Sequence, residues 1–132
     1  MLDMGLDYLS LGMSHPVGSP ERTNYLNAAV DYVHEAGYPD YTAKSLLARG
    51  SESDLQAAAR IASRSGMRLV LADVHLAFAR QSFSRAVHQE SVRHYNNARA
   101  LISETGYHRR DSELEQIRVS LSQERRSVSE AQ

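Results

Sequence analysis

Apolar residues recur along this chain at spacings of three and four positions, which is the period of an α-helix with one buried side. Leu26, Ala29, Val30 and Val33 form the clearest stripe of this kind. Glycine and proline are confined to a few points between such runs, and strict strand-like alternation is absent from the sequence. The pattern therefore predicts an all-α chain.

Turn residues divide the pattern into about seven helices. Pro20 follows Ser19, a combination typical of a helix start, and Gly37, Gly50 and Gly106 are expected to end helices. Two Ser-x-x-Gln/Glu sequences, 53–56 and 112–115, predict capping boxes. The expected helices are 2–14, 20–36, 39–49, 53–65, 67–83, 88–105 and 111–126, followed by a frayed tail, 127–132.

The same spacing predicts which side of each later helix is buried. These inward positions are Ala43, Leu46, Leu47, Ala72, Leu76, Ala79, Phe83, Val92, Tyr95, Ala98, Ile102, Leu114, Ile117 and Leu121. We therefore expect a single helical-repeat domain over 1–126, built from hairpins 2–36, 39–65 and 67–105 with a capping helix 111–126.

A glycine followed by a large side chain and a new helix occurs three times, in 34–40, 63–69 and 103–109. Successive glycines are 29 and 40 residues apart. A helical hairpin cannot bury its own apolar face, so a recurrence on this scale predicts that neighbouring hairpins stack on one another.

The later unit places Phe78-Ala79, Ser91, Tyr95 and Ala98 at successive spacings of 12, 4 and 3. This pattern resembles the tetratricopeptide motif, in which small residues lie where two helices approach closely and a ring lies at their contact. The first unit repeats this spacing with Leu9-Ser10, Arg22, Leu26 and Ala29. Arg22 stands there at the position that Ser91 occupies in the later unit, where the motif has a small residue. The middle unit, Leu47-Ala48 with Ser51, Leu55 and Ala58, shortens the first gap to 3.

Two stretches, 66–80 and 98–111, resemble the C-terminal tetratricopeptide tails of large bacterial signalling ATPases. In that family the nucleotide chemistry lies upstream of the tail, and the tail serves as a sensing or assembly surface. No Gly-x4-Gly-Lys-Ser/Thr loop occurs in this sequence. Because the sequence begins within a helical pattern, we expect it to be a segment of a larger signalling or regulatory protein.

Charge and composition narrow the classes of partner. Fifteen Lys and Arg against sixteen Asp and Glu leave a net charge of −1, which disfavours nucleic acid and anionic membrane as partners. Two arginine pairs, Arg109-Arg110 and Arg125-Arg126, could attract a phosphate backbone. The glutamates between them reduce the positive electrostatic potential of these pairs. The absence of cysteine excludes thiolate metal sites and cysteine nucleophiles. With no run of about 20 apolar residues, we expect a cytoplasmic protein.

Few residues suggest catalysis, so we expect neither an enzyme nor a bound cofactor or metal. His88 and His94 are six positions apart and do not share a helix face. His75 is interpreted as a histidine at the edge of the core. The group 107–111, Tyr-His-Arg-Arg-Asp, is interpreted as a helix connection. Tyr107 is expected to pack over the preceding terminus, and Asp111 to cap the seventh helix or pair locally with an arginine.

The resemblance implies a scaffold whose first helix in each pair lines a concave surface that binds a polar peptide or protein segment. The positions expected to contact the partner are Asp7, Ser45, Arg49, Asp73 and Arg80, with Phe83 as an apolar anchor. Two alternatives remain open at this point. One is a packing segment that self-associates without a separate ligand, and the other is a small helical enzyme or ligand carrier with a pocket near the histidines.

Overall fold

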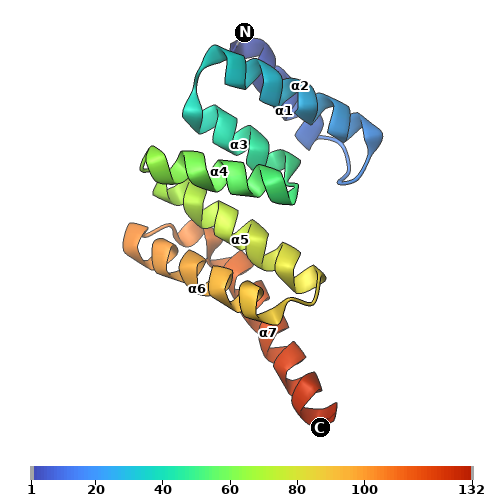
Figure 1. The fold of residues 1–132 in the computed structure, drawn as a ribbon, viewed down its shortest axis with the longest axis vertical. Coiled ribbons are helices and arrows are strands. Elements are labelled where there is room, and N and C mark those ends of the chain that lie inside the picture. The colour runs from blue at the N-terminus through green and yellow to red at the C-terminus, as the bar shows by residue number, and fades with distance from the viewer. Residues whose placement is uncertain (1, 132) are drawn as a thin grey trace. The chain divides into compact units, whose positions relative to one another are not determined.

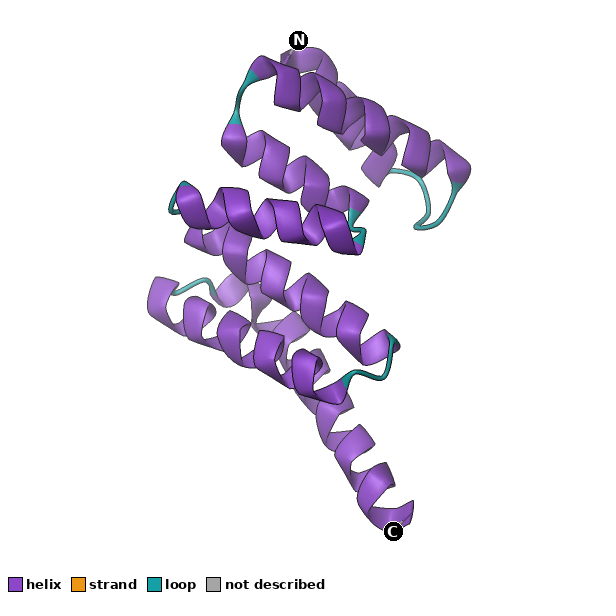
Figure 2. Cartoon of the chain, viewed as in Figure 1, coloured by secondary structure: helices purple, strands orange, loops and turns teal. Residues whose placement is uncertain are grey.

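A computed structural model describes the backbone of residues 2–131 and the side chains of residues 2–124. Within these residues the chain is helical and contains no strand (Figure 2). Figure 1 shows the order of the elements. They are α1 (Leu2–Met13), α2 (Pro20–Ala36), α3 (Pro39–Arg49), α4 (Glu52–Arg64), α5 (Arg68–Ser84), α6 (His88–Thr105), the short 3-10 helix η1 (His108–Arg110) and α7 (Asp111–Ala131).

The predicted fold class is confirmed over the described residues, which form seven α-helices with contacts mainly between consecutive helices. None of these helices is both long enough and apolar enough to cross a lipid bilayer. The last helix was expected to end near residue 126, whereas the backbone of α7 continues to Ala131. The expected frayed tail, 127–132, lies outside the residues whose side chains are described.

The chain divides into two compact units, Met1–Val70 and Leu71–Gln132. In the first unit, α1 packs on α2, α2 on α3 and α3 on α4. The first two helices therefore form a hairpin, as the sequence predicted for 2–36. Their apolar stripe is buried as expected, since Leu26, Ala29 and Val33 are almost inaccessible to solvent.

Two glycines allow α1 and α2 to approach closely. A Cβ added to Gly5 would lie 2.5 Å from Val33 Cγ2, and one added to Gly12 would lie 2.7 Å from Leu26 Cδ2. At these distances a side chain at either position would force the Val33 or Leu26 side chain to shift, so glycine allows the observed packing. Helical spacing had indicated a close contact at Ser10 and Arg22 instead and gave no signal for these glycines.

Helix ends follow the predictions in part. The Ser19 Oγ accepts a hydrogen bond from the Arg22 N–H at 3.2 Å, which confirms the N-cap of α2. Gly37, Gly50 and Gly106 end helices with positive φ angles of 79°, 74° and 71°, which glycine adopts without a steric penalty.

Both predicted capping boxes are wrong. The α4 cap is Ser51, because the Ser51 Oγ accepts from the Asp54 N–H at 3.1 Å and the Asp54 carboxylate accepts from the Ser51 N–H at 3.2 Å. Helix α4 therefore begins before Ser53. Ser112 lies inside α7, because η1 leads directly into that helix at Asp111.

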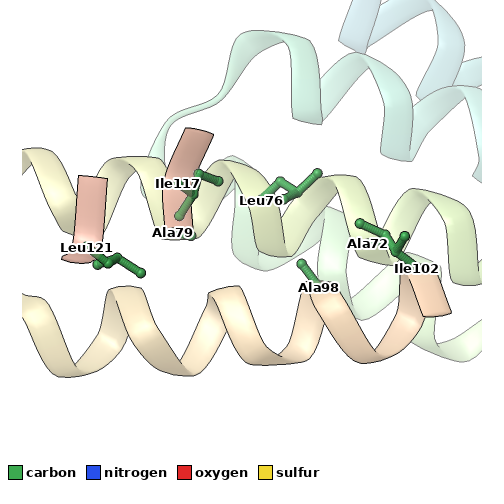
Figure 3. Packing of buried hydrophobic residues seen from close by; sticks show 7 residues of the cluster. All are labelled: Ala72, Leu76, Ala79, Ala98, Ile102, Ile117 and Leu121. Atoms are coloured by element: carbon green, nitrogen blue, oxygen red, sulfur yellow. The ribbon is translucent and has the colours of Figure 1, made fainter. Parts of the chain in front are cut away.

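The core of the second unit is formed by α5, α6 and α7. Figure 3 shows side chains from the three helices meeting around Leu76. Its buried members are Ala72, Leu76, Ala79, Ala98, Ile102, Ile117 and Leu121. Ser91 is also fully buried, and its Oγ donates a hydrogen bond to the Ala79 carbonyl at 2.8 Å. Small residues at positions 79, 91 and 98 thus allow α5 and α6 to approach closely, as their spacing predicted.

Ser45 on α3 has a buried hydroxyl without a hydrogen-bond partner among the described residues. An unpaired buried hydroxyl is destabilising, and alanine is a better helix former than serine. We expect Ser45→Ala to raise the free energy of unfolding by about 1 kcal/mol, measured by urea denaturation. Ser10→Ala on the exposed side of α1 changes helix propensity alone and is the control. A Ser45→Ala protein less stable than this control contradicts the prediction.

Candidate functional site

A groove of about 260 Å³ lies between the C-terminal half of α5 and the N-terminal half of α7. Its lining residues are Arg80, Phe83 and Ser84 from α5, and Glu113, Gln116, Ile117 and Ser120 from α7. Phe83 packs against the core of the second unit, and Ile117 is a buried member of that core. We call this feature the α5–α7 groove. It combines an apolar surface, continuous with the core, and charged side chains.

The charged side chains belong to an alternating chain of ion pairs. Asp73 on α5 accepts from Arg110 at 2.8 Å, Arg110 donates to Glu113 at 2.6 Å, and Glu113 accepts from Arg80 at 3.0 Å. Glu113 is therefore held by two guanidinium groups. The Arg80 side chain is 53% exposed, so the cation at the groove end of this chain stays accessible to a ligand.

The side chains of the group 107–111 contact one another and the second unit, but Asp111 pairs with His108 rather than with an arginine. The Tyr107 ring packs against the core of the second unit, and its hydroxyl donates to Asp73 Oδ2 at 3.3 Å. His108 Nδ1 lies 3.1 Å from Asp111 Oδ2. Burial lowers the pKa of Arg110, but hydrogen bonds to Asp73 and attraction to Asp73 and Glu113 outweigh it and raise the pKa above its ordinary value. This segment therefore holds α5 to the start of α7.

His75 and His94 form a pair that the sequence analysis missed. Their Nδ1 atoms are 2.9 Å apart, and the His94 ring stacks on Phe78 with centroids 4.6 Å apart. The Nδ1–H of one ring therefore donates to the Nδ1 of the other, and the two imidazole centroids are 5.2 Å apart. Burial, followed by repulsion from His94 and Arg93, lowers the pKa of His75 to about 4.

A low pKa for both rings suits a hydrogen bond between neutral imidazoles. Burial also lowers the pKa of His94, with a further contribution from Arg93. His88 is directed elsewhere, since its Nδ1 lies 3.2 Å from Glu124. Over the described part of the chain, no three His, Asp or Glu side chains are grouped in a way that could hold a metal ion.

The six positions expected to bind a partner are divided between the two units, three in each. Arg80 and Phe83 lie together in the α5–α7 groove, and Asp73 is linked to that groove through Arg110 and Glu113. Asp7 is exposed on α1, in the first unit. The groove residues of α7 were missed as binding candidates, because only Ile117 carried a signal and that signal indicated the core.

Two of the six residues, Ser45 and Arg49, take part in the packing and hydrogen bonding of the first unit. Ser45 was expected to be exposed, but it is 0% exposed, because the side of α3 that carries it also carries Thr42 and Leu46 and is buried. Arg49 donates two hydrogen bonds to Asp54, at 2.8 and 2.6 Å, and a third to Asn27 at 3.2 Å. Its guanidinium is therefore occupied within the first unit.

No protein-family model, curated protein or solved structure matches this chain, so the α5–α7 groove is interpreted from its own geometry and chemistry.

Proposed function

We propose that this chain is a protein-interaction module and that the α5–α7 groove binds a short polar segment of a partner protein. The observation that carries the proposal is the placement of the exposed Arg80 guanidinium beside Phe83 and Ile117. A site of this kind suits a segment in which a carboxylate lies next to an apolar side chain. The proposed role is binding rather than catalysis, within a larger signalling or regulatory protein.

Each part of such a segment has a counterpart in the groove. The apolar side chain contacts Phe83 and Ile117, where burial is favourable. Hydroxyl and amide groups of Ser84, Gln116 and Ser120 can pair with the backbone of the segment. The carboxylate pairs with Arg80, and charge-assisted bonds of this type are stronger than neutral ones.

Arg80 can accept a new partner without leaving a charge unpaired. Its present partner, Glu113, also accepts from Arg110 at 2.6 Å, and Arg110 is itself paired with Asp73. When a ligand carboxylate engages Arg80, Glu113 therefore keeps one guanidinium contact. The exposed end of the ion-pair chain is the part best suited to exchange with a ligand.

The test uses fluorescein-labelled short peptides in which leucine precedes glutamate, together with matched peptides in which glutamine replaces the glutamate. We expect the full chain to bind the glutamate peptide more tightly in fluorescence anisotropy. Arg80→Ala should weaken that binding by about tenfold, because it removes one charge-assisted bond. The same substitution should leave binding of the glutamine peptide nearly unchanged.

Arg109→Ala is the matched control, since Arg109 is exposed and does not line the groove. A second variant, Phe83→Ala, should weaken the binding of both peptides to a similar degree, because it removes the contact with their apolar side chain. Equal binding of the glutamate peptide to the Arg80→Ala and Arg109→Ala proteins would show that the groove is not the binding site.

A further inference from the structure

Four aromatic rings form a continuous row on the α1–α2 hairpin of the first unit. Tyr8 on α1 stacks between Tyr25 and Tyr32 of α2, with centroid distances of 6.1 and 5.6 Å. His15, in the connection after α1, stacks on Tyr25 at 5.4 Å. We call these four residues the aromatic row. None of them belongs to the α5–α7 groove.

The close approach of the two helices produces this row. Tyr25 and Tyr32 are seven positions apart, which places them two turns apart on one side of α2. Tyr8 lies between Gly5 and Gly12, the two positions of α1 at which an added Cβ would collide with side chains of α2. The ring of Tyr8 reaches between the two tyrosines of α2, so the three stacked tyrosines all belong to this hairpin.

The row remains accessible along its edge. All four rings are only partly buried. Apolar side chains of α1 extend the surface, since Met4 is 47% exposed and Leu11 is 44% exposed. Met4 lies four positions before Tyr8 and Leu11 lies three positions after it, so both are neighbours of that ring on the helix surface.

Carboxylates border the row on both helices. Asp7 lies between Met4 and Leu11 at helical spacing, Glu21 lies four positions before Tyr25, and Glu35 lies three positions after Tyr32. All three are exposed. Residues 2–36 contain five acidic residues and one arginine, a formal charge of −4, whereas the whole chain carries −1.

The one arginine of this hairpin does not offset the acidic border. Arg22 donates a hydrogen bond to the His15 carbonyl at 3.1 Å and so lies against the connection between α1 and α2. A neutral apolar partner would remove water from the bordering carboxylates without replacing its hydrogen bonds, which is costly. A partner with cationic side chains would replace the lost water contacts of these carboxylates with ion pairs.

We propose that the aromatic row is a docking surface for a basic peptide segment, one that carries several Lys or Arg side chains. The methylene groups of these Lys or Arg side chains pack against the ring edges and against Met4 and Leu11. Their charged ends reach the carboxylates of Asp7, Glu21 and Glu35. Long cationic side chains commonly combine apolar packing and a solvated charge in this way. The tyrosine hydroxyls can accept further hydrogen bonds from the same groups.

The test uses the full chain and a fluorescein-labelled peptide of alternating lysine and serine, compared with a peptide in which glutamate replaces lysine. We expect the lysine peptide to bind and the glutamate peptide not to bind in fluorescence anisotropy. Binding should weaken as salt is added, because exposed charges are screened. The paired substitution Asp7→Asn and Glu35→Gln should weaken binding by about tenfold.

The matched control is Glu90→Gln with Glu115→Gln, which removes two exposed carboxylates from the second unit and changes the net charge equally. This control should retain at least half of the wild-type affinity, and circular dichroism should show equal helicity for all three proteins. Equal loss in both paired variants would overturn the proposal, because it would indicate attraction by net charge alone.

Self-association through the aromatic row would overturn the proposal as well. In that case the apparent molar mass in light scattering would increase with protein concentration, and the lysine peptide would not bind. Arg80→Ala provides a separate control for the proposed function. It should leave lysine-peptide binding unchanged, so failure of either proposal can be recognised without reference to the other.

Discussion

Leu76→Ala is expected to lower the free energy of unfolding by about 3 kcal/mol, because the substitution leaves a cavity in a closely packed core. Leu76 is 1% exposed and lies at the centre of the cluster formed by α5, α6 and α7. The cluster is built from three helices, so closing a cavity in it would require more than one helix to move. Urea denaturation followed by circular dichroism measures the change.

The matched control for this prediction is Leu69→Ala, which makes the same chemical change on the same helix. Leu69 is 45% exposed, so its truncation removes less buried area and creates a smaller cavity. We expect a loss of less than about 1 kcal/mol for this variant. Equal losses for the two leucines would contradict the assignment of Leu76 to the core of the second unit.

Arg49→Ala is expected to destabilise the first unit by about 2 kcal/mol, because it leaves a buried carboxylate without its guanidinium partner. The Asp54 side chain is 6% exposed, whereas that of Arg49 is 30% exposed. Breaking fully buried ion pairs costs about 3–5 kcal/mol, and partial exposure of Arg49 reduces that figure. Arg60→Ala on the exposed side of α4 is the control and should have little effect.

The pH dependence of stability follows from the same carboxylate. Burial alone would raise the pKa of Asp54, but hydrogen bonds from Arg49 and Ser51 outweigh it and lower the pKa below its ordinary value. The stabilising contribution is therefore present above the pKa of the unfolded chain, about 3.9, and is lost as pH falls through the lower value of the folded state. Asp54→Asn should remove this part of the acid dependence.

These expectations change how Arg49 is interpreted. The sequence analysis assigned Arg49 and Arg80 to the same binding surface, but Arg49 is occupied by Asp54 and Asn27, and Arg80 lies in the α5–α7 groove. If Arg49→Ala weakens partner binding, the free energy of unfolding of this variant must therefore be measured as well. Only a loss of binding without a loss of stability would indicate that Arg49 contacts the partner. If Arg49→Ala unfolds at the same urea concentration as Arg60→Ala, the structural role is wrong.

The positions of the helices could be predicted from sequence because their causes are local. A stripe such as Leu26, Ala29, Val30 and Val33 lies within two turns of one helix, and a glycine such as Gly106 ends a helix through its own φ angle. The capping boxes failed for a related reason. Ser51 and Ser53 have the same local chemistry, but Ser51 is the cap of α4, and the Asp54 carboxylate that completes its capping box also pairs with Arg49.

The candidate sites could not be predicted because their members come from distant parts of the chain. Asp73 and Arg110 are 37 positions apart, and His75 and His94 are 19 positions apart. Helical spacing indicates which side of a helix is apolar, but not which side chain of another helix lies opposite it. Ser45 shows the same limit, since one polar residue on a buried side is indistinguishable in sequence from an exposed one.

Local sequence patterns are enough to predict the all-α class, the approximate bounds of seven helices and most of the buried positions, because helix formation depends on neighbours within about four positions. Which side chains meet across helices depends on the tertiary structure. It paired Arg49 with Asp54, brought Arg80 and Phe83 together with α7, and aligned Tyr8 between Tyr25 and Tyr32. Such contacts depend on how closely two backbones approach, and at the first hairpin Gly5 and Gly12 set that distance.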